Sequence, residues 1–305
     1  MELLAQLIAR ASELLDRLER RMPSGPAEPD WEGAIAFRWR GAGHANPLQP
    51  IRNPHRLALA DILCVDRQKC ELDRNTRQFI QGLPANNALL WGSKGTGKSS
   101  LIKALLNEYA SVGLRVVEVD RQHLVELPDI LELLYPRSEK FILFSDDLSF
   151  EADDAGYKAL KSTLEGSFSA PPANVLIYAT SNRRHLLPEY REENLQARHI
   201  EGEIHQGEAV EEKISLSERF GLWLSFYPFN QDQYLDIVRY WLDKLHTPLD
   251  DWEAVRTEAL RFALQRGSRS GRVAWQFAKD WSGRMQLDIR PANNPRSFQM
   301  TTGID

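Results

Sequence analysis

A glycine-rich loop between an apolar run and a helix-forming segment constrains the fold of this chain more than any other feature. Residues 92–99 read G-S-K-G-T-G-K-S, which matches the P-loop spacing G-x-x-x-x-G-K-[ST]. Gly92 and Gly97 allow backbone conformations closed to residues with a Cβ, so successive N–H groups can point into one concavity around a phosphate. Lys98 supplies a charge for the β- and γ-phosphates, and the Ser99 hydroxyl is a typical Mg²⁺ ligand.

The flanks of the loop distinguish it from a chance match. Ala88–Trp91 is apolar and predicts a strand, whereas Lys98–Tyr109 predicts a helix whose N-terminus favours an anion. This strand–loop–helix context is the one a P-loop requires, so we expect a nucleoside triphosphate site. The residues expected to contact the nucleotide are Gly92, Ser93, Lys94, Gly95, Thr96, Gly97, Lys98, Ser99 and Ser100.

Composition predicts a globular, cytoplasmic protein of more than one domain. The chain has 305 residues, 42% hydrophobic and 27% charged. Its net charge of −5 leaves nucleic acid open as a partner but does not favour it. Cys64 and Cys70, the only cysteines, have neither zinc-site nor disulfide-framework spacing, which indicates a reducing compartment. No apolar run approaches the ~20 residues that span a bilayer, so no membrane association is expected.

Alternating strand and helix patterns predict an α/β fold with a parallel sheet covered on both faces. The predicted strands are Ala88–Trp91, Leu114–Val119, Phe141–Phe144, Val175–Thr180 and Leu222–Phe226. The predicted helices are Asp66–Ile80, Lys98–Tyr109, Pro128–Leu134, Ala155–Glu165 and Gln231–Leu245, and Asp251–Met285 reads as helices only.

The N-terminal part differs from the rest in pattern. An amphipathic helix is expected through about Arg21, followed by a Pro- and Gly-rich segment whose Trp31, Phe37 and Trp39 indicate that it packs onto something. This part either recognises a partner or covers the core. The expected domains are 1–54 (this N-terminal segment), 55–229 (α/β domain), 230–290 (helical lid) and 291–305 (loose tail).

Two carboxylates, Asp146 and Asp147, follow the buried strand Phe141–Phe144. Ligands bind at the carboxyl ends of strands in open α/β sheets, so these side chains are expected near the P-loop. In P-loop enzymes the first acid holds Mg²⁺ and the second polarises the attacking water. The alternative is a solvated acidic turn, and the upstream P-loop favours the functional interpretation.

Three further polar positions have two interpretations each. Asn182 follows the strand ending at Thr180, where it either orients water or, with Ser181, caps a helix. Arg219 precedes the strand beginning at Leu222 and is either a surface residue or reaches the nucleotide of a neighbouring subunit. The run Arg266–Arg272 is either a basic helix-start loop or contains an arginine that senses the nucleotide.

Taken in order, these elements resemble the AAA+ ATPases. More narrowly, the chain resembles the prokaryotic AAA+ family catalogued as domain of unknown function 815, over about Leu57 to Trp281. The motifs that carry this resemblance are PANN at Pro84–Asn87 with the P-loop, FILFSDDLSF at Phe141–Phe150, NVLIYATSNRRHL at Asn174–Leu186, EEKISLSERFGLWLSF at Glu211–Phe226 and RGSRSGR at Arg266–Arg272.

The resemblance implies roles for single residues. Asp146 would be the Mg²⁺-associated Walker B acid, Asp147 the base and Asn182 the sensor 1 residue. Arg219 would be the arginine finger, acting in trans. Arg272 would be the sensor 2 residue, with Arg269 as the alternative.

The resemblance also implies a sheet order of 5-1-4-3-2 with a helical lid, ATP and Mg²⁺ as cofactors, and a homo-oligomeric ring with a hexamer as candidate size. The implied function is ATP hydrolysis that drives remodelling of an unidentified macromolecular partner, and a protein is the expected partner. The Asp146-Asp147 pair replaces the usual Asp-Glu, and Val119–Val125 lacks the aromatic residue of protein-threading members. These departures keep open a slow, nucleotide-switched binding module resembling helicase loaders; a small-molecule kinase is a weaker third hypothesis.

Overall fold

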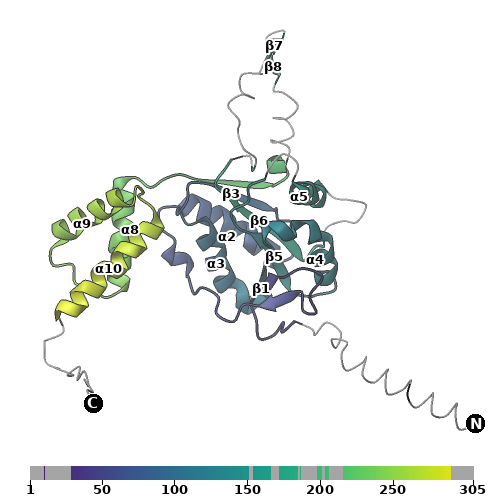
Figure 1. Cartoon of the computed structure of the whole chain (residues 1–305), viewed down its shortest axis with the longest axis horizontal. Helices are drawn as coiled ribbons and strands as arrows, with labels where there is room; N and C mark the ends of the chain where they lie inside the picture. The colour runs from purple at the N-terminus through teal and green to yellow at the C-terminus, as the bar shows by residue number, and fades with distance from the viewer. Residues whose placement is uncertain are drawn as a thin grey trace, which may run out of the picture. The chain divides into compact units, whose positions relative to one another are not determined.

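The computed structural model describes residues 10, 29–150, 154–165, 172–184, 186, 198–200, 203–205 and 216–289 (Figure 1). The chain divides into two compact units. The first runs to Tyr227 without Lys94–Thr96, and the second joins Lys94–Thr96 to the chain from Pro228 onward. The helix expected up to Arg21, apart from Arg10, and the tail 291–305 lie outside the described residues.

A seven-stranded sheet in the order β2-β1-β4-β5-β6-β3-β9 organises the first unit. Its neighbouring strands are parallel, except for the antiparallel pair β1 and β2. The order β9-β3-β6-β5-β4 within it is the expected 5-1-4-3-2, which the structure confirms. The strands are β1 (Ala36–Trp39), β2 (Leu48–Pro50), β3 (Ala88–Gly92), β4 (Leu114–Glu118), β5 (Lys140–Ser145), β6 (Val175–Ser181) and β9 (Leu222–Phe226), and a separate antiparallel pair is formed by β7 (Arg198–Ile200) and β8 (Glu203–His205).

Strands β1 and β2 were not expected from the sequence, and they lie before residue 55, where the α/β domain was expected to begin. β1 pairs in parallel with β4, placing Ala36 opposite Val116. Phe37 is fully buried, and Trp31 and Trp39 are buried with it in the core cluster. Strands of four and three residues are too short to show a recognisable period in sequence. The Pro- and Gly-rich segment therefore completes the core of this unit.

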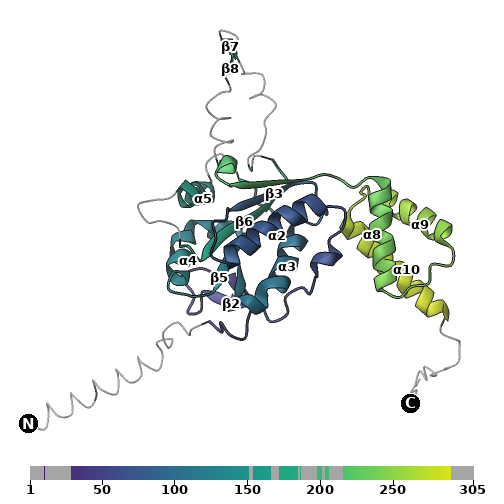
Figure 2. The same cartoon turned by 180° about the vertical axis from the view of Figure 1, so that it is seen from behind.

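Helices cover both faces of the sheet (Figures 1 and 2). Successive residues of a strand point to opposite faces. On β6, Ile177 belongs to the core cluster that includes α4 and α5 side chains, whereas the Tyr178 hydroxyl contacts Asn75 and Thr76 of α2. The helices of this unit are α2 (Asp66–Ile80), α3 (Lys98–Tyr109), α4 (Leu127–Leu134) and α5 (Ala155–Glu165), with 3-10 turns η1 (Leu59–Asp61), η2 (Ala110–Val112) and η3 (Arg121–Glu126).

The second unit contains the helices α8 (Gln231–Lys244), α9 (Trp252–Gln265) and α10 (Gly271–Ile289). Asn230 begins α8 with a capping box, in which its side chain accepts from the Gln233 N–H and the Gln233 side chain accepts from the Asn230 N–H. The fully buried Tyr234 ties α8 to α9 by donating its hydroxyl to the Ala259 carbonyl at 3.1 Å. Across the described residues, no helix combines the length and apolar character needed to cross a bilayer.

Candidate nucleotide-binding site

The first glycine of the P-loop lies where β3 ends against β9. Gly92 is in register with Phe226 and has φ of +127°. A Cβ at this position would lie 2.0 Å from the Phe226 carbonyl oxygen, which real Cβ atoms do not approach. The Ser93 N–H then donates to the same carbonyl at 3.0 Å. Glycine is therefore required by the packing of two strands as well as by the loop.

The third glycine of the loop begins helix α3. Gly97 has φ of +98° and is the N-cap of α3, and Gly95 has φ of +74°. Both are left-handed conformations that glycine adopts without steric cost. Because the first N–H groups of a helix have no partner within it, the N-terminus of α3 presents donors and a positive dipole end to an anion.

The P-loop lysine is buried and held by main-chain oxygens. Lys98 Nζ donates to the carbonyls of Gly92 at 2.7 Å and Ser93 at 2.8 Å, and to Asn182 Oδ1 at 3.3 Å. Only 7% of the residue is exposed. The ammonium group is thus placed between the start of the P-loop and the end of β6, where it can meet a phosphate.

The structure brings the side chains of Ser99 and Asp146 together. The Ser99 hydroxyl, from the first turn of α3, donates to Asp146 Oδ1 at 2.6 Å. Asp146 directly follows β5. A hydroxyl and a carboxylate are hard oxygen ligands of the kind that Mg²⁺ takes from proteins.

Asp147 and Asn182 also lie together. The Asn182 side-chain amide donates to Asp147 Oδ1, while its Oδ1 accepts from Lys98. Asn182 therefore contacts the P-loop lysine and the second acid through its two ends. The sequence left open whether Asn182 is a helix cap, and these contacts favour a position within the site.

Thr180 is a residue of this cluster that the sequence interpretation did not identify. Its hydroxyl donates to Asp146 Oδ1 at 2.5 Å and accepts from the Asp147 N–H at 2.9 Å. The only signal in the sequence was a hydroxyl residue in an otherwise apolar strand, where a threonine is also an ordinary β-former.

Arg219 lies at the opposite end of the strands. It precedes β9 by three residues, whereas the P-loop follows β3, which runs parallel to β9 in register. A strand of five residues at about 3.3 Å each separates the two ends by roughly 17 Å. The Arg219 guanidinium donates to Glu165, the last residue of α5.

The two lid arginines belong to the second unit. Arg269 precedes α10 and Arg272 lies in its first turn, and both are exposed. In the same unit, the Gly271 N–H donates to the Gly95 carbonyl at 2.9 Å. The assignment of either arginine as sensor 2 stays a prediction.

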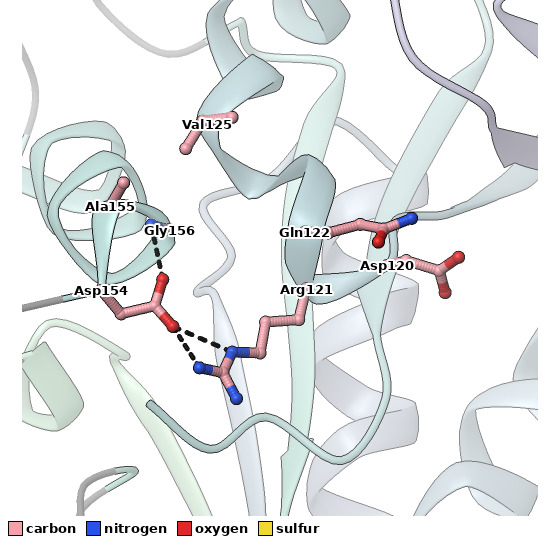
Figure 3. Close-up of a pocket in the computed structure, with 7 residues that line it drawn as sticks. All are labelled: Asp120, Arg121, Gln122, Val125, Asp154, Ala155 and Gly156. Carbon is pink, nitrogen blue, oxygen red and sulfur yellow. Dashed lines mark hydrogen bonds and ion pairs between the residues drawn. The ribbon is translucent and has the colours of Figure 1, made fainter. Parts of the chain in front are cut away.

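A cavity of about 610 Å³ lies beside η3 and the start of α5, and none of the predicted site residues lines it (Figure 3). Arg121 Nε donates to Asp154 Oδ2 at 2.9 Å, and Asp154 Oδ1 accepts from the Gly156 N–H at 2.8 Å. Figure 3 shows the Gln122 side chain pointing away from this pair. Burial opposes ionisation of Asp154, but the hydrogen bonds from Arg121 and Gly156 outweigh it and lower its pKa.

The residues of the cluster fit MgATP. Gly92 and Gly97 have positive φ, the buried ammonium group of Lys98 lies against the Gly92 carbonyl, and Ser99 and Asp146 offer oxygen ligands beside each other. Within the parts of the chain that the structure describes, no group of three or more His, Cys, Asp or Glu could hold a metal by itself. Mg²⁺ usually takes one or two protein carboxylates and completes its shell with phosphate and water, and Asp146 is a carboxylate of this kind.

Comparisons with solved structures agree with this fold. The RuvB Holliday junction branch migration motor of Thermotoga maritima is 16% identical, with a TM-score of 0.53 over 76% of this chain and 66% of that one. The Aeropyrum pernix ORC1 protein in complex with DNA is 15% identical, with a TM-score of 0.52 over 74% of this chain and 61% of that one. The chain spans less than two thirds of either structure, and at this identity the likeness shows a shared fold alone.

Comparison with curated proteins gives no match. A family profile described as "Protein of unknown function (DUF815)" matches residues 32–285, which include β1, the P-loop, the acid pair, α8, α9 and most of α10. This chain has the fold of AAA+ P-loop domains, and because the family match covers most of both compact units, it belongs to the DUF815 family.

Proposed function

We propose that this protein is a Mg²⁺-dependent ATPase that acts in a homo-oligomer and uses ATP to remodel a macromolecular partner. The observation that carries the proposal is the pair of linked contacts from Lys98 through Asn182 to Asp147 and from Ser99 to Asp146. Both links join the phosphate-binding loop to the acids that follow β5. Asp146 and Asp147 are exposed, and it is these contacts that distinguish them from an acidic turn with no role at the site.

In this proposal each side chain has a defined task. When bound, MgATP supplies the γ-phosphoryl group and a cation that stabilises its charge. Lys98 stabilises negative charge on the phosphates, and Asp146 with Ser99 holds the cation at the sheet edge. Asp147 accepts the proton of the attacking water, which Asn182 helps to orient.

Two substitutions test the chemistry. Purified Lys98→Ala should lose binding of a fluorescent ATP analogue, whereas Asp147→Asn should bind it and hydrolyse ATP at least ~100-fold more slowly. The exposed Lys158→Ala and Asp129→Asn are matched controls that should behave like the wild type. Wild-type turnover in Asp147→Asn would refute the assignment of the base.

The proposed oligomer rests on the position of Arg219. A guanidinium at the amino ends of the strands is roughly 17 Å from the carboxyl ends, so it would serve the nucleotide of a neighbouring copy. An arginine supplied in trans is worth about 10³–10⁵ in rate. The hydrolysis rate per subunit should therefore rise steeply with protein concentration.

A mixing experiment tests this position directly. Arg219→Ala and Lys98→Ala should each be inactive alone, yet an equimolar mixture should regain activity, because Lys98→Ala subunits supply Arg219 to intact P-loops. Arg261→Ala, an exposed arginine paired with Glu258 on α9, is the control and should stay active alone. No recovery in the mixture, with oligomers present by light scattering, would contradict an arginine acting in trans.

The second candidate function is a slow, nucleotide-switched binding module. The ion pair between Arg219 and Glu165 favours it, because this arginine already has a partner within its own chain. A low hydrolysis rate that does not change with protein concentration, together with ATP-dependent capture of a partner by Asp147→Asn, would support this alternative. DNA is one candidate partner to include, since the ORC1 structure contains it.

A further inference from the structure

Thr180 contacts three consecutive residues of the segment that follows β5. Its hydroxyl donates to Asp146 Oδ1 at 2.5 Å and accepts from the Asp147 N–H at 2.9 Å. Its carbonyl accepts from the Leu148 N–H at 2.7 Å. One residue of β6 thereby holds the whole acid-bearing segment against the neighbouring strand.

The backbone at Asp147 needs such support. Asp147 has φ of +52°, which lies in the left-handed region that residues with a Cβ seldom occupy. Strained conformations of this kind persist only where the surroundings over-determine them. The bond from the Asp147 N–H to the Thr180 hydroxyl and the next bond from Leu148 bracket this residue, so they fix the direction in which its carboxylate leaves the chain.

The same hydroxyl orients the first acid. Asp146 Oδ1 accepts from both Thr180 and Ser99, the latter at 2.6 Å, so the two hydroxyls determine the rotation of this carboxylate. Thr180 is only 1% exposed, so bulk solvent does not compete for its hydroxyl. Its position is fixed in turn by the pairing of β6 with β3 and β5.

We propose that Thr180 is a positioning residue that aligns Asp146 for the cation and Asp147 for the attacking water through a single hydroxyl. This inference rests on the proposed ATPase function and adds the residue that couples the two acids. Groups that hydrogen-bond to a metal-binding carboxylate typically contribute about 10–100-fold in metal affinity or activity. We expect a loss of this size when the hydroxyl is removed.

The test compares Thr180→Val with two matched variants. Valine keeps the shape of threonine and removes both hydroxyl contacts, whereas Thr180→Ser retains the hydroxyl. Thr76→Val is the control for loss of a buried hydroxyl, because Thr76 is fully buried and its hydroxyl bonds to the Leu72 carbonyl at 2.8 Å and the Tyr178 hydroxyl at 2.9 Å. Thermal melting of all three variants checks that they fold.

Three measurements distinguish positioning from stability. Thr180→Val should raise the Mg²⁺ concentration that half-saturates Mg²⁺-dependent ADP binding about 10–100-fold. It should lower kcat by a similar factor while leaving KM for ATP little changed. It should also speed hydrogen exchange of the Asp147 amide. Thr180→Ser should recover most of each effect. Thr76→Val should lower the melting temperature without changing these three properties.

The outcomes separate this inference from the function on which it rests. If the wild type binds ADP without any Mg²⁺ dependence and does not hydrolyse ATP, the proposed function fails. If the wild type shows both activities and Thr180→Val matches it in Mg²⁺ dependence and kcat, the positioning role is overturned. Equal effects of Thr180→Val and Thr76→Val would overturn it as well, because both would then reflect lost stability.

Discussion

Replacing the first P-loop glycine by alanine isolates what that glycine does for the fold. The new Cβ of Gly92→Ala would lie 2.0 Å from the Phe226 carbonyl oxygen and 2.8 Å from its carbonyl carbon. Both atoms belong to the backbone of β9, so no side-chain rotation relieves the overlap. Either β3 and β9 must separate locally or the backbone at Gly92 must leave its φ of +127°.

The cost follows from two contributions. A left-handed or mirror-region φ costs a residue with a Cβ about 1–2 kcal/mol. Forcing an extra carbon into a packed site costs typically about 1–3 kcal/mol more. We therefore expect Gly92→Ala to lower the free energy of opening of the β3–β9 pair by about 2–5 kcal/mol, a large part of the about 5–15 kcal/mol that stabilises a typical domain.

A second glycine separates the two contributions. Gly113 has φ of +96°, but a Cβ there would meet no atom within 4 Å. Gly113→Ala should therefore lose only the conformational term of about 1–2 kcal/mol. The difference between the variants measures the overlap with Phe226.

Native-state hydrogen exchange is the suitable assay, read at the β3 amides for Gly92→Ala and at the β4 amides for Gly113→Ala, because it reports the opening of each element without requiring the whole chain to unfold in one step. Thermal melting of both variants gives an independent ranking. The reasoning is refuted if Gly92→Ala and Gly113→Ala are destabilised equally, since the close approach to β9 would then contribute nothing.

Three further predictions concern residues outside the P-loop. Burial raises the pKa of Tyr178 to about 12, so the unfolded state releases this proton before the folded state does. The free energy of unfolding should therefore fall by up to about 2–3 kcal/mol as the pH rises from about 10 to 12. In urea titrations across that range, Tyr178→Phe should lack this part of the decline. Asp154→Ala removes the side chain that caps α5 and should lower the free energy of unfolding at pH 7 by about 1 kcal/mol. Because the Asp154 pKa is lowered in the folded state, this difference from the wild type should shrink as the pH falls below about 4. A difference that does not change with pH would contradict the role of the charge. Asn230→Ala breaks the capping box of α8 and should lower the opening free energy of the second unit by about 1 kcal/mol, measured by amide hydrogen exchange in α8. Exchange of the β3 amides should not change and serves as the control. Unchanged exchange in α8 would show that the cap is dispensable.

Strong local patterns account for what could be predicted. The helices Asp66–Ile80, Lys98–Tyr109 and Ala155–Glu165 begin and end where the sequence placed them. Each of the five predicted strands is present with its ends within one residue. These elements carry several large apolar residues in a row or at helical spacing, so their period is visible without knowledge of their neighbours.

Contacts between distant segments of the chain account for the features that could not be predicted from the sequence. β1 and β2 are short and lie in a Pro- and Gly-rich stretch, and they become strands because Phe37 and Trp39 are buried beside β4. Thr180 looks like an ordinary strand residue until the register of β6 against β5 places its hydroxyl beside both acids. A tertiary hydrogen bond of this kind has no local signature.

By itself, the sequence determined the glycine-rich P-loop, the acids after β5 and the alternating α/β order, because each depends on residues adjacent in the chain. Tertiary structure alone decided how these parts combine: that Asn182 contacts both Lys98 and Asp147, that Thr180 supports the left-handed Asp147, and that Arg219 pairs with Glu165. Motifs are local because a loop or a strand is built from neighbours. The alignment of a catalytic site depends instead on the register of a sheet, which is set by packing across the whole fold.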